Sequence, residues 1–285
     1  MKIVECPRDG LQGIKNFIPT VKKIELINTL LEVGFDTIDI GSFVSPKAFP
    51  QMVDTDEVIN NINYEGKTKL LALVVNKMGS DMACQFDQIS YLGFPFSISN
   101  TFLERNVNSN IPIVLQRFHT INECALACNK KMLVYFSMGF GNPYGDPWNL
   151  DILDEYIEYF IDYGVDMISM SDTIGISKVD DIKEIFTFLI EKYPKVEFGF
   201  HLHSRRNEWF NRINAAYESG VEKFDSVIGG LGGCPSAFDS EKLISNLETK
   251  NLIHYFDNKG ININLNLEKY NRAEELIKNI KSIYL

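Results

Sequence analysis

The chain has 285 residues, 45% of them hydrophobic, and its 28 Lys and Arg residues against 38 Asp and Glu residues give a formal net charge of −10. This length suits either one α/β barrel or two smaller domains. Because no basic run interrupts the acidic balance, nucleic acid and anionic membrane surfaces are not expected as partners.

Short runs rich in β-branched and aromatic residues alternate along the chain with longer segments of helical spacing. The predicted strands are residues 2–5, 36–40, 69–75, 88–97, 132–137, 166–170, 197–201 and 223–228. The predicted helices are residues 21–33, 55–62, 77–85, 112–129, 150–163, 178–193, 206–219 and 240–256. Repeated β–α units require parallel strands, and eight such units predict a closed (β/α)8 TIM barrel of the α/β class.

A doubly wound open sheet is the alternative fold. Such a sheet usually carries a glycine-rich dinucleotide turn after its first strand, whereas this chain has CPRDGLQ at residues 6–12. Apolar residues at helical spacing in residues 267–285 predict an additional C-terminal helix. We therefore expect a single domain over residues 1–285, with the barrel in about residues 1–260.

Polar residues of the kinds used in catalysis follow the carboxyl ends of several predicted strands, where barrel enzymes place their active sites. They are Arg8, Asp9, Asp39, Asp172, His201 and His203. Convergence on one rim of the barrel, more than any single residue, indicates a functional site.

His201 and His203 are two residues apart, so on a strand both imidazoles face the same side. This arrangement suits two ligands of one metal ion, and Asp9 at the end of the first strand offers an oxygen ligand across a closed ring. In the alternative interpretation, the histidines are ordinary polar residues at a strand end and Asp9 is a turn residue before Gly10.

Asp39 and Asp172 also have structural interpretations. Asp39 fits a buried strand-end carboxylate paired with Arg8. Asp172, in the segment SDTIG, fits a residue that caps the next helix or stabilises the turn. Both interpretations remain open beside the catalytic one.

The run GGLGGCP at residues 229–235 has four glycines in its first five positions. A tight turn needs only one or two glycines, so we interpret the run as a mobile lid. Closure of such a lid would bring Cys234 to a ligand as an acid, base or nucleophile. The alternative is a plain turn in which Cys234 packs.

The cysteines are Cys6, Cys84, Cys124, Cys128 and Cys234, and their odd number and irregular spacing do not indicate a disulfide framework. Cys124 and Cys128 share one helix face, but no second ligand pair follows to make a zinc site, so we interpret both as packing residues. The first ten residues show no apolar core of a secretory signal, and no apolar run approaches the roughly 18 residues of a membrane span. A reducing cytoplasm is therefore the expected location.

With these motifs established, the chain resembles the 3-hydroxy-3-methylglutaryl-CoA (HMG-CoA) lyases, within the wider family of metal-dependent barrel lyases and acyl-CoA condensing enzymes. The resemblance covers nearly the whole chain and is most specific in five stretches. They are PRDGLQ (7–12), SFVSPKAFPQM (42–52), SDTIG (171–175), HLH (201–203) and GLGGCP (230–235). The Arg-Asp pair and His-x-His are shared with the condensing enzymes, whereas SFVSPK together with GLGGCP points to the lyases.

The resemblance implies a divalent cation, Mg²⁺ or Mn²⁺, bound by a set of four side chains. The implied metal ligands are Asp9, His201, His203 and Asn246. Asn246 enters through the family's motif alone, here SNLET at residues 245–249, because its place in a predicted helix otherwise indicates a helix surface residue. The implied catalytic residues are Arg8, Asp39, Asp172, His201 and Cys234.

The implied reaction is a retro-Claisen cleavage of HMG-CoA to acetyl-CoA and acetoacetate, as in leucine degradation. Arg8 would stabilise the enolate oxygen, and the metal would chelate the tertiary hydroxyl and the terminal carboxylate. Asp39, or His201 through it, would be the base, and Cys234 would protonate the carbanion of acetyl-CoA.

The implied partner is a small-molecule acyl-CoA, and a homodimer is compatible with the resemblance. An anionic coenzyme on an acidic chain needs a local positive rim. Lys15, Lys47 and Arg105 are candidates for it, although the motifs do not identify the residues that contact coenzyme A.

Three positions depart from the family's usual residues: Asp39 stands where Glu is typical, Ser204 where Asp is typical and Ser236 where an aromatic residue is typical. The family's FGCPY also appears as FGNPY at residues 140–144. These departures leave two alternatives open. One is a lyase or condensing enzyme of the same family acting on a related 3-hydroxyacyl-CoA, and the other is a non-catalytic barrel that binds an acyl-CoA.

Overall fold

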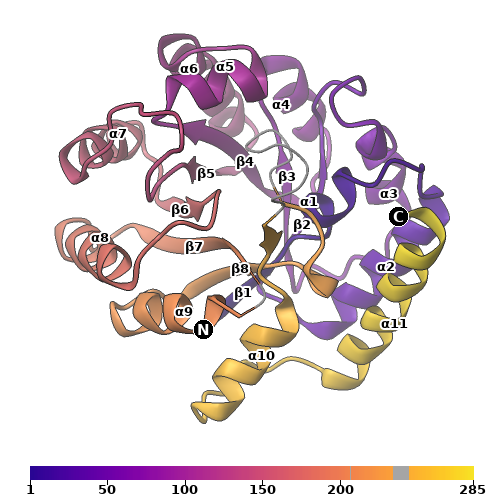
Figure 1. Ribbon diagram of the computed structural model, residues 1–285. Helices are drawn as coiled ribbons and strands as arrows, with labels where there is room; N and C mark the ends of the chain where they lie inside the picture. Colours follow the sequence, from indigo (N-terminus) through magenta and orange to yellow (C-terminus); the bar gives the residue numbers. More distant parts are fainter. Residues whose placement is uncertain (206, 234–243) are drawn as a thin grey trace.

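The computed structural model describes residues 1–205, 207–233 and 244–285. In this part of the chain, eight strands pair in parallel, each with the next, and the eighth returns to the first (Figure 1). The strands are β1 (Lys2–Glu5), β2 (Thr37–Ser42), β3 (Lys69–Leu73), β4 (Ile89–Ser97), β5 (Lys131–Ser137), β6 (Met167–Asp172), β7 (Glu197–Ser204) and β8 (Lys223–Ser226). The predicted TIM barrel is confirmed, and the open sheet is excluded because the ring closes.

Helices surround the ring on its outer side (Figure 1). They are α2 (Thr20–Val33), α3 (Thr55–Asn61), α4 (Lys77–Ala83), α6 (Ile111–Ala127), α7 (Leu150–Asp162), α8 (Val179–Lys192), α9 (Trp209–Glu218), α10 (Thr249–Asn258) and α11 (Leu267–Tyr284), with the shorter α1 (Pro7–Gln12) and α5 (Asn100–Val107) in loops. In α7, Leu153, Ile157 and Phe160 recur at helical spacing and are buried. The Asn149 side chain accepts a hydrogen bond from the Ile152 N–H, which satisfies one of the free donors at the start of α7.

Aromatic rings fill much of the layer between the strands and the helices. Phe96 from β4 lies 4.9 Å from Phe160 of α7, and Phe136 from β5 lies 5.8 Å from the same ring, measured between centroids. Phe118 from α6 completes the group at 4.7 Å from Phe160. Edge-on aromatic contacts of this kind fix the helices against the barrel and so fix the strand ends that carry polar residues.

The amino ends of the strands carry a network of ion pairs. Lys223 is 2% exposed, and its Nζ lies 2.8 Å from Glu197 Oε1. Glu197 also pairs with Lys2. Because these charges satisfy one another, chemistry is expected at the opposite, carboxyl end of the barrel.

Two local predictions are corrected. The segment after β1, expected as a loop, forms α1, with Pro7 in its first turn, where the missing N–H of proline costs nothing. The helix predicted for residues 240–256 begins only at Thr249, while β9 (Ser245–Asn246) pairs antiparallel with β7. Residues 240–243 lie outside the described part of the chain.

Cys84 at the end of α4 forms a disulfide with Cys128 at the end of α6. The interpretation of Cys128 as a packing residue is therefore wrong. The two cysteines are 44 residues apart and belong to different helices, a relation that local spacing cannot show. Among the described cysteines, Cys6 and Cys124 are free thiols.

The predicted C-terminal helix is α11, which packs along α2 (Figure 1). Its buried residues include Tyr270, Ala273, Ile277 and Ile280, which recur at helical spacing. Within the described residues, every helix is too short or too polar for a membrane span.

Candidate functional site

Six polar residues predicted from the sequence meet at the carboxyl ends of β1, β2 and β7, where β9 joins them. They are Arg8, Asp9, Asp39, His201, His203 and Asn246. Arg8 and Asp9 lie in α1 directly after β1, so the tight turn into α1 aims both side chains across the mouth of the barrel. The structure brings Arg8, Asp9, Asp39, His201 and His203 together on one rim as the strand ends predict, and Asn246, which only the family motif implied, joins them.

Arg8 and Asp39 form a buried pair. Arg8 Nε and Nη2 donate to Asp39 Oδ2 at 2.9 and 2.5 Å. Arg8 Nη1 donates to Asp9 Oδ1 at 3.2 Å and to Gln12 Oε1 at 3.0 Å. Four of the five N–H donors of the guanidinium therefore bind neighbouring side chains, which holds the group in one orientation.

The other oxygen of Asp39, Oδ1, is buried and has no hydrogen-bond partner among the described residues. Burial raises the pKa of Asp39 to about 6, although the Arg8 charge opposes this rise. The strand-end carboxylate thus fits its predicted pairing with Arg8 and still keeps an oxygen that can accept a proton.

The two histidines of β7 face each other as the alternation of side chains predicts. Nε2 of His201 lies 3.1 Å from Nε2 of His203. Nδ1 of His201 lies 3.1 Å from Asp225 Oδ2, and Nδ1 of His203 lies 2.8 Å from the Thr173 carbonyl oxygen. If each Nδ1 carries the proton and donates it to its oxygen, both Nε2 lone pairs point into the same space.

This geometry fits two ligands of one cation. Adjacent ligands of an octahedral ion at about 2.1 Å lie about 3.0 Å apart. Asp9, His201 and His203 each place one ligand atom within 4.8 Å of the others. A carboxylate with two imidazoles is therefore ready to hold a divalent cation.

Asn246 is the fourth candidate metal ligand, and β9 brings it to the other three. The antiparallel register places Asn246 opposite His203, and the side chain is 3% exposed. Asn246 Nδ2 donates to Asp9 Oδ2 at 2.6 Å and to the Leu231 carbonyl oxygen at 2.9 Å. Its Oδ1 is buried without a hydrogen-bond partner in the described chain, as expected of an oxygen that binds a cation. The default interpretation of Asn246 as a helix surface residue is wrong, since it lies in a strand.

Burial and neighbouring charges shift the pKa values of Asp9 and His203 at this rim. Burial disfavours ionisation of Asp9, but Arg8, His201 and His203 outweigh it and hold the pKa of Asp9 below its ordinary value. Burial, with the neighbouring His201, lowers the pKa of His203 to about 4. A neutral imidazole beside an ionised carboxylate is the state that binds a metal ion.

Asp225 belongs to this site and was missed from the sequence. It lies in β8, its side chain is fully buried, and it accepts from Ser169 Oγ at 2.9 Å as well as contacting His201. The parallel register places Asp225 directly beside His201. Alternation within β8 next to the His-x-His strand was the signal that could have identified it.

The glycine-rich run begins against the same site. Gly229, Gly230, Gly232 and Gly233 all have positive φ, so the glycines are used for their conformation. A Cβ at Gly232 would lie 2.7 Å from Asn246 Nδ2 and 2.8 Å from the Asp9 carbonyl oxygen. The predicted use of glycine is supported, whereas Cys234 and the rest of the run lie outside the described residues.

Asp172 stands apart from this cluster. Its Oδ1 accepts from the Ile176 N–H at 2.9 Å, and its Oδ2 accepts from the Ser177 N–H at 3.0 Å and the Ser177 hydroxyl at 2.5 Å. Burial raises the pKa of Asp172 despite these bonds. The contacts support the interpretation of Asp172 as a residue that shapes the turn after β6, and its catalytic role stays a prediction.

The three cationic candidates for coenzyme binding are exposed and follow carboxyl ends of strands. Lys15 comes after α1, Lys47 lies in the loop after β2, and Arg105 lies in α5 after β4. The Arg105 guanidinium sits 4.7 Å from the centroid of the Tyr144 ring. Their role in binding coenzyme A stays a prediction.

Comparison with known proteins gives consistent matches. The family model described as HMGL-like matches residues 2–277. Mitochondrial hydroxymethylglutaryl-CoA lyase from Macaca fascicularis is 33% identical over 280 residues, which cover 97% of this chain and 84% of that protein.

Solved structures agree over the same range. The HMG-CoA lyase from Bacillus subtilis has a TM-score of 0.92 at 29% identity, covering 99% of this chain and 93% of that chain. An HMG-CoA lyase from Acinetobacter baumannii, in complex with coenzyme A and 3-methylmalate, has a TM-score of 0.91 at 28% identity, covering 99% and 91% respectively. The similarity in fold therefore extends over nearly the whole chain.

Proposed function

This chain belongs to the HMGL-like family, and from that premise we propose that it is a divalent-metal-dependent carbon–carbon lyase. The proposed reaction cleaves HMG-CoA to acetyl-CoA and acetoacetate. One observation carries the proposal beyond family membership: two Nε2 atoms 3.1 Å apart and the unpartnered Oδ1 of Asn246 meet beside the buried Arg8–Asp39 pair. A cation site and a proton-accepting carboxylate thus share one rim.

We propose that Asp9, His201, His203 and Asn246 would hold the cation, taken as Mg²⁺ or Mn²⁺ from the mixture of oxygen and imidazole donors. When bound, such an ion lowers the pKa of a coordinated hydroxyl and offsets the charge of a substrate carboxylate. Four protein ligands leave two octahedral positions for these two substrate oxygens.

Arg8 would stabilise the enolate oxygen that develops when the carbon–carbon bond breaks. Four of its N–H donors are engaged with Asp39, Asp9 and Gln12, and the fifth is available to a substrate oxygen. Because Asp39 fixes the guanidinium before substrate arrives, no reorganisation is needed during the reaction.

Asp39 is the proposed base for the tertiary hydroxyl. Its Oδ1 is unpartnered within the described residues, and with a pKa of about 6 it is ionised at neutral pH. The route from His201 through Asp39 has less support, because the carboxylate that contacts His201 is Asp225. Cys234 remains the proposed acid for the acetyl-CoA carbanion.

The direct test is incubation of the purified, metal-loaded protein with HMG-CoA. Release of acetoacetate is expected, and its absence across roughly pH 7 to 9, where a thiol titrates, would contradict the proposal. Cys234→Ala should lower turnover strongly while leaving metal content unchanged. A Cys234→Ala variant with the wild-type rate would remove the thiol from the mechanism.

The second candidate function keeps the site and changes the acyl group or runs the reaction in the condensing direction. It rests on Asp39 and Ser204, which are both buried, and on Ser236, which lies outside the described residues. A panel of 3-hydroxyacyl-CoA substrates distinguishes it from HMG-CoA cleavage. Stoichiometric binding of acyl-CoA without turnover would instead indicate the non-catalytic barrel. The cytoplasmic location and the homodimer stay predictions.

A further inference from the structure

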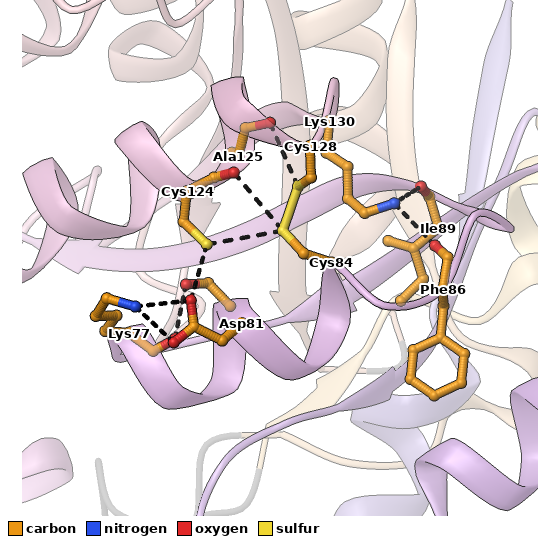
Figure 2. The surroundings of a disulfide bond; sticks show 10 residues. Lys77, Asp81, Cys84, Phe86, Ile89, Cys124, Ala125, Cys128 and Lys130 are labelled. Atoms are coloured by element: carbon orange, nitrogen blue, oxygen red, sulfur yellow. Dashed lines mark hydrogen bonds and ion pairs between the residues drawn. A yellow bond between two sulfur atoms is a disulfide. The ribbon is translucent and has the colours of Figure 1, made fainter.

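Three of the described cysteines lie together between α4 and α6, on the outer layer of the barrel (Figure 2). Cys84 is bonded to Cys128, and Cys124 Sγ lies 3.8 Å from Cys84 Sγ. All three residues are partly exposed. The sulfur atoms of both Cys124 and Cys128, at the end of α6, therefore lie next to the Cys84 Sγ.

The free thiol of Cys124 is held in place by a neighbouring ion pair. Cys124 Sγ donates to Asp81 Oδ1 at 3.2 Å, and Lys77 Nζ lies 2.6 Å from Asp81 Oδ2 (Figure 2). Cys124 and Cys128 are four residues apart at the end of α6, so one helix face presents both sulfurs to Cys84.

We propose that Cys84, Cys124 and Cys128 form a thiol–disulfide exchange site in which Cys84 pairs with either cysteine of α6. Cys124, as a thiolate, attacks Cys84 Sγ. The Cys84–Cys124 bond forms as the Cys84–Cys128 bond breaks, and Cys128 leaves as a thiolate that takes up the proton lost by Cys124. No electrons are gained or lost, so this step needs no external oxidant.

The site would also react with low-molecular-weight thiols. A small thiolate that attacks Cys84 displaces Cys128 and leaves a mixed disulfide on Cys84. Cys124 then attacks Cys84 and releases the small thiol, forming the Cys84–Cys124 bond. Cys124 is therefore the resolving thiol of this cluster. The proposal is independent of the lyase activity, since no residue of the metal site takes part.

The test uses the full chain equilibrated in a buffer of reduced and oxidised glutathione. Acid quenching, alkylation of free thiols and peptide mass spectrometry then locate each disulfide. Fragmentation between Cys124 and Cys128 separates the two pairings. Both the Cys84–Cys128 and the Cys84–Cys124 bonds are expected in the wild-type protein.

Two matched variants sharpen the test. Cys128→Ser should form only the Cys84–Cys124 bond, and Cys124→Ser only the Cys84–Cys128 bond. Absence of the Cys84–Cys124 bond from both the wild type and Cys128→Ser would overturn the proposal. If Cys128→Ser does not fold, the wild-type map alone decides.

Discussion

Asp225 holds the imidazole of His201 on the side away from the proposed cation. Its Oδ2 lies 3.1 Å from Nδ1 of His201, and carboxylates in this position fix the orientation of a metal-binding histidine and increase its basicity. Asp225→Asn keeps the shape of the side chain but removes its charge. We expect Mn²⁺ affinity to fall by about 10- to 100-fold, measured by titration calorimetry.

A matched control for this variant is Asp166→Asn, because Asp166 is partly exposed at the amino end of the barrel and pairs with Lys131 at 2.5 Å. This control should bind Mn²⁺ as the wild type does. Equal affinities of Asp225→Asn and the wild type would show that His201 needs no carboxylate partner.

Gly232 lies directly against Asn246 and Asp9 of the proposed metal site. A Cβ there would approach Asn246 Nδ2 to 2.7 Å, and the residue has a φ of +83°. Gly66 has a similar φ of +80° but nothing within 4 Å of the added carbon. Both alanine variants should lose roughly 1 to 2 kcal/mol of stability from backbone strain. Only Gly232→Ala should also lose Mn²⁺ affinity, which calorimetry on the two variants compares directly.

Most of the site could be predicted at the level of residues, and the exceptions have physical reasons. His201 and His203 follow from alternation in a strand, and Arg8 and Asp9 follow from their place after β1. Asn246 could not be derived from local pattern, because a two-residue strand is too short to show periodicity. Asp172 lies near the rim, but its hydrogen bonds stay within its own turn.

At the level of elements, the eight strands were predictable because each is a short apolar run buried against helices on one side and barrel contents on the other. Element ends were less predictable. β7 continues past its predicted end at residue 201 to Ser204, so that it carries both histidines of the proposed metal site. The extra residues of β7 are in a strand because they pair with β6 and β9, and the sequence of β7 alone does not predict these pairings.

Glu5 links three elements at the closure of the ring. Its Oε1 accepts from the Ile228 N–H at 2.7 Å, and its Oε2 accepts from the Thr249 hydroxyl at 2.5 Å at the start of α10. Burial raises the pKa of Glu5 from 4.5 to about 8, although both hydrogen bonds oppose the rise. The folded protein therefore binds this proton more tightly than the unfolded chain does.

The sign of the pH dependence follows. Stability from protonated Glu5 is fully present below about pH 4.5 and is lost as the pH rises through about 8. We expect Glu5 to contribute a fall in the free energy of unfolding of up to about 1.4 kcal/mol per pH unit in this window. Urea unfolding of Glu5→Gln at several pH values should show a shallower fall than the wild type, and parallel curves would contradict the assignment.

On the scale of the whole molecule, α11 ties the end of the chain to its beginning. Asn16 Nδ2 donates to the Tyr284 carbonyl oxygen at 3.0 Å, and Lys281 Nζ donates to the Gly229 carbonyl oxygen at 3.3 Å. Ile277 is 2% exposed and packs beside Gly229. The helix therefore supports the point from which the glycine-rich run departs.

Ile277→Ala should lower the free energy of unfolding by about 2 to 5 kcal/mol, because it leaves a cavity under this helix. Ile283→Ala, on the same helix but 66% exposed, should change it by only about 0.5 kcal/mol or less. Urea unfolding measures both. If both variants lose only a similar small amount of unfolding free energy, then packing of α11 contributes little to the stability of the barrel.

Ring closure between β1 and β8 sets an order of events during protein synthesis. A ribosome makes β1 and Asp9 early, yet the partners of Asp9 in the site are His201, His203 and Asn246, near the other end of the chain. The nascent chain must therefore hold its first strand unpaired on one side until β8 has emerged. Capture of the proposed cation by this full set of ligands can then occur only after translation has passed residue 246.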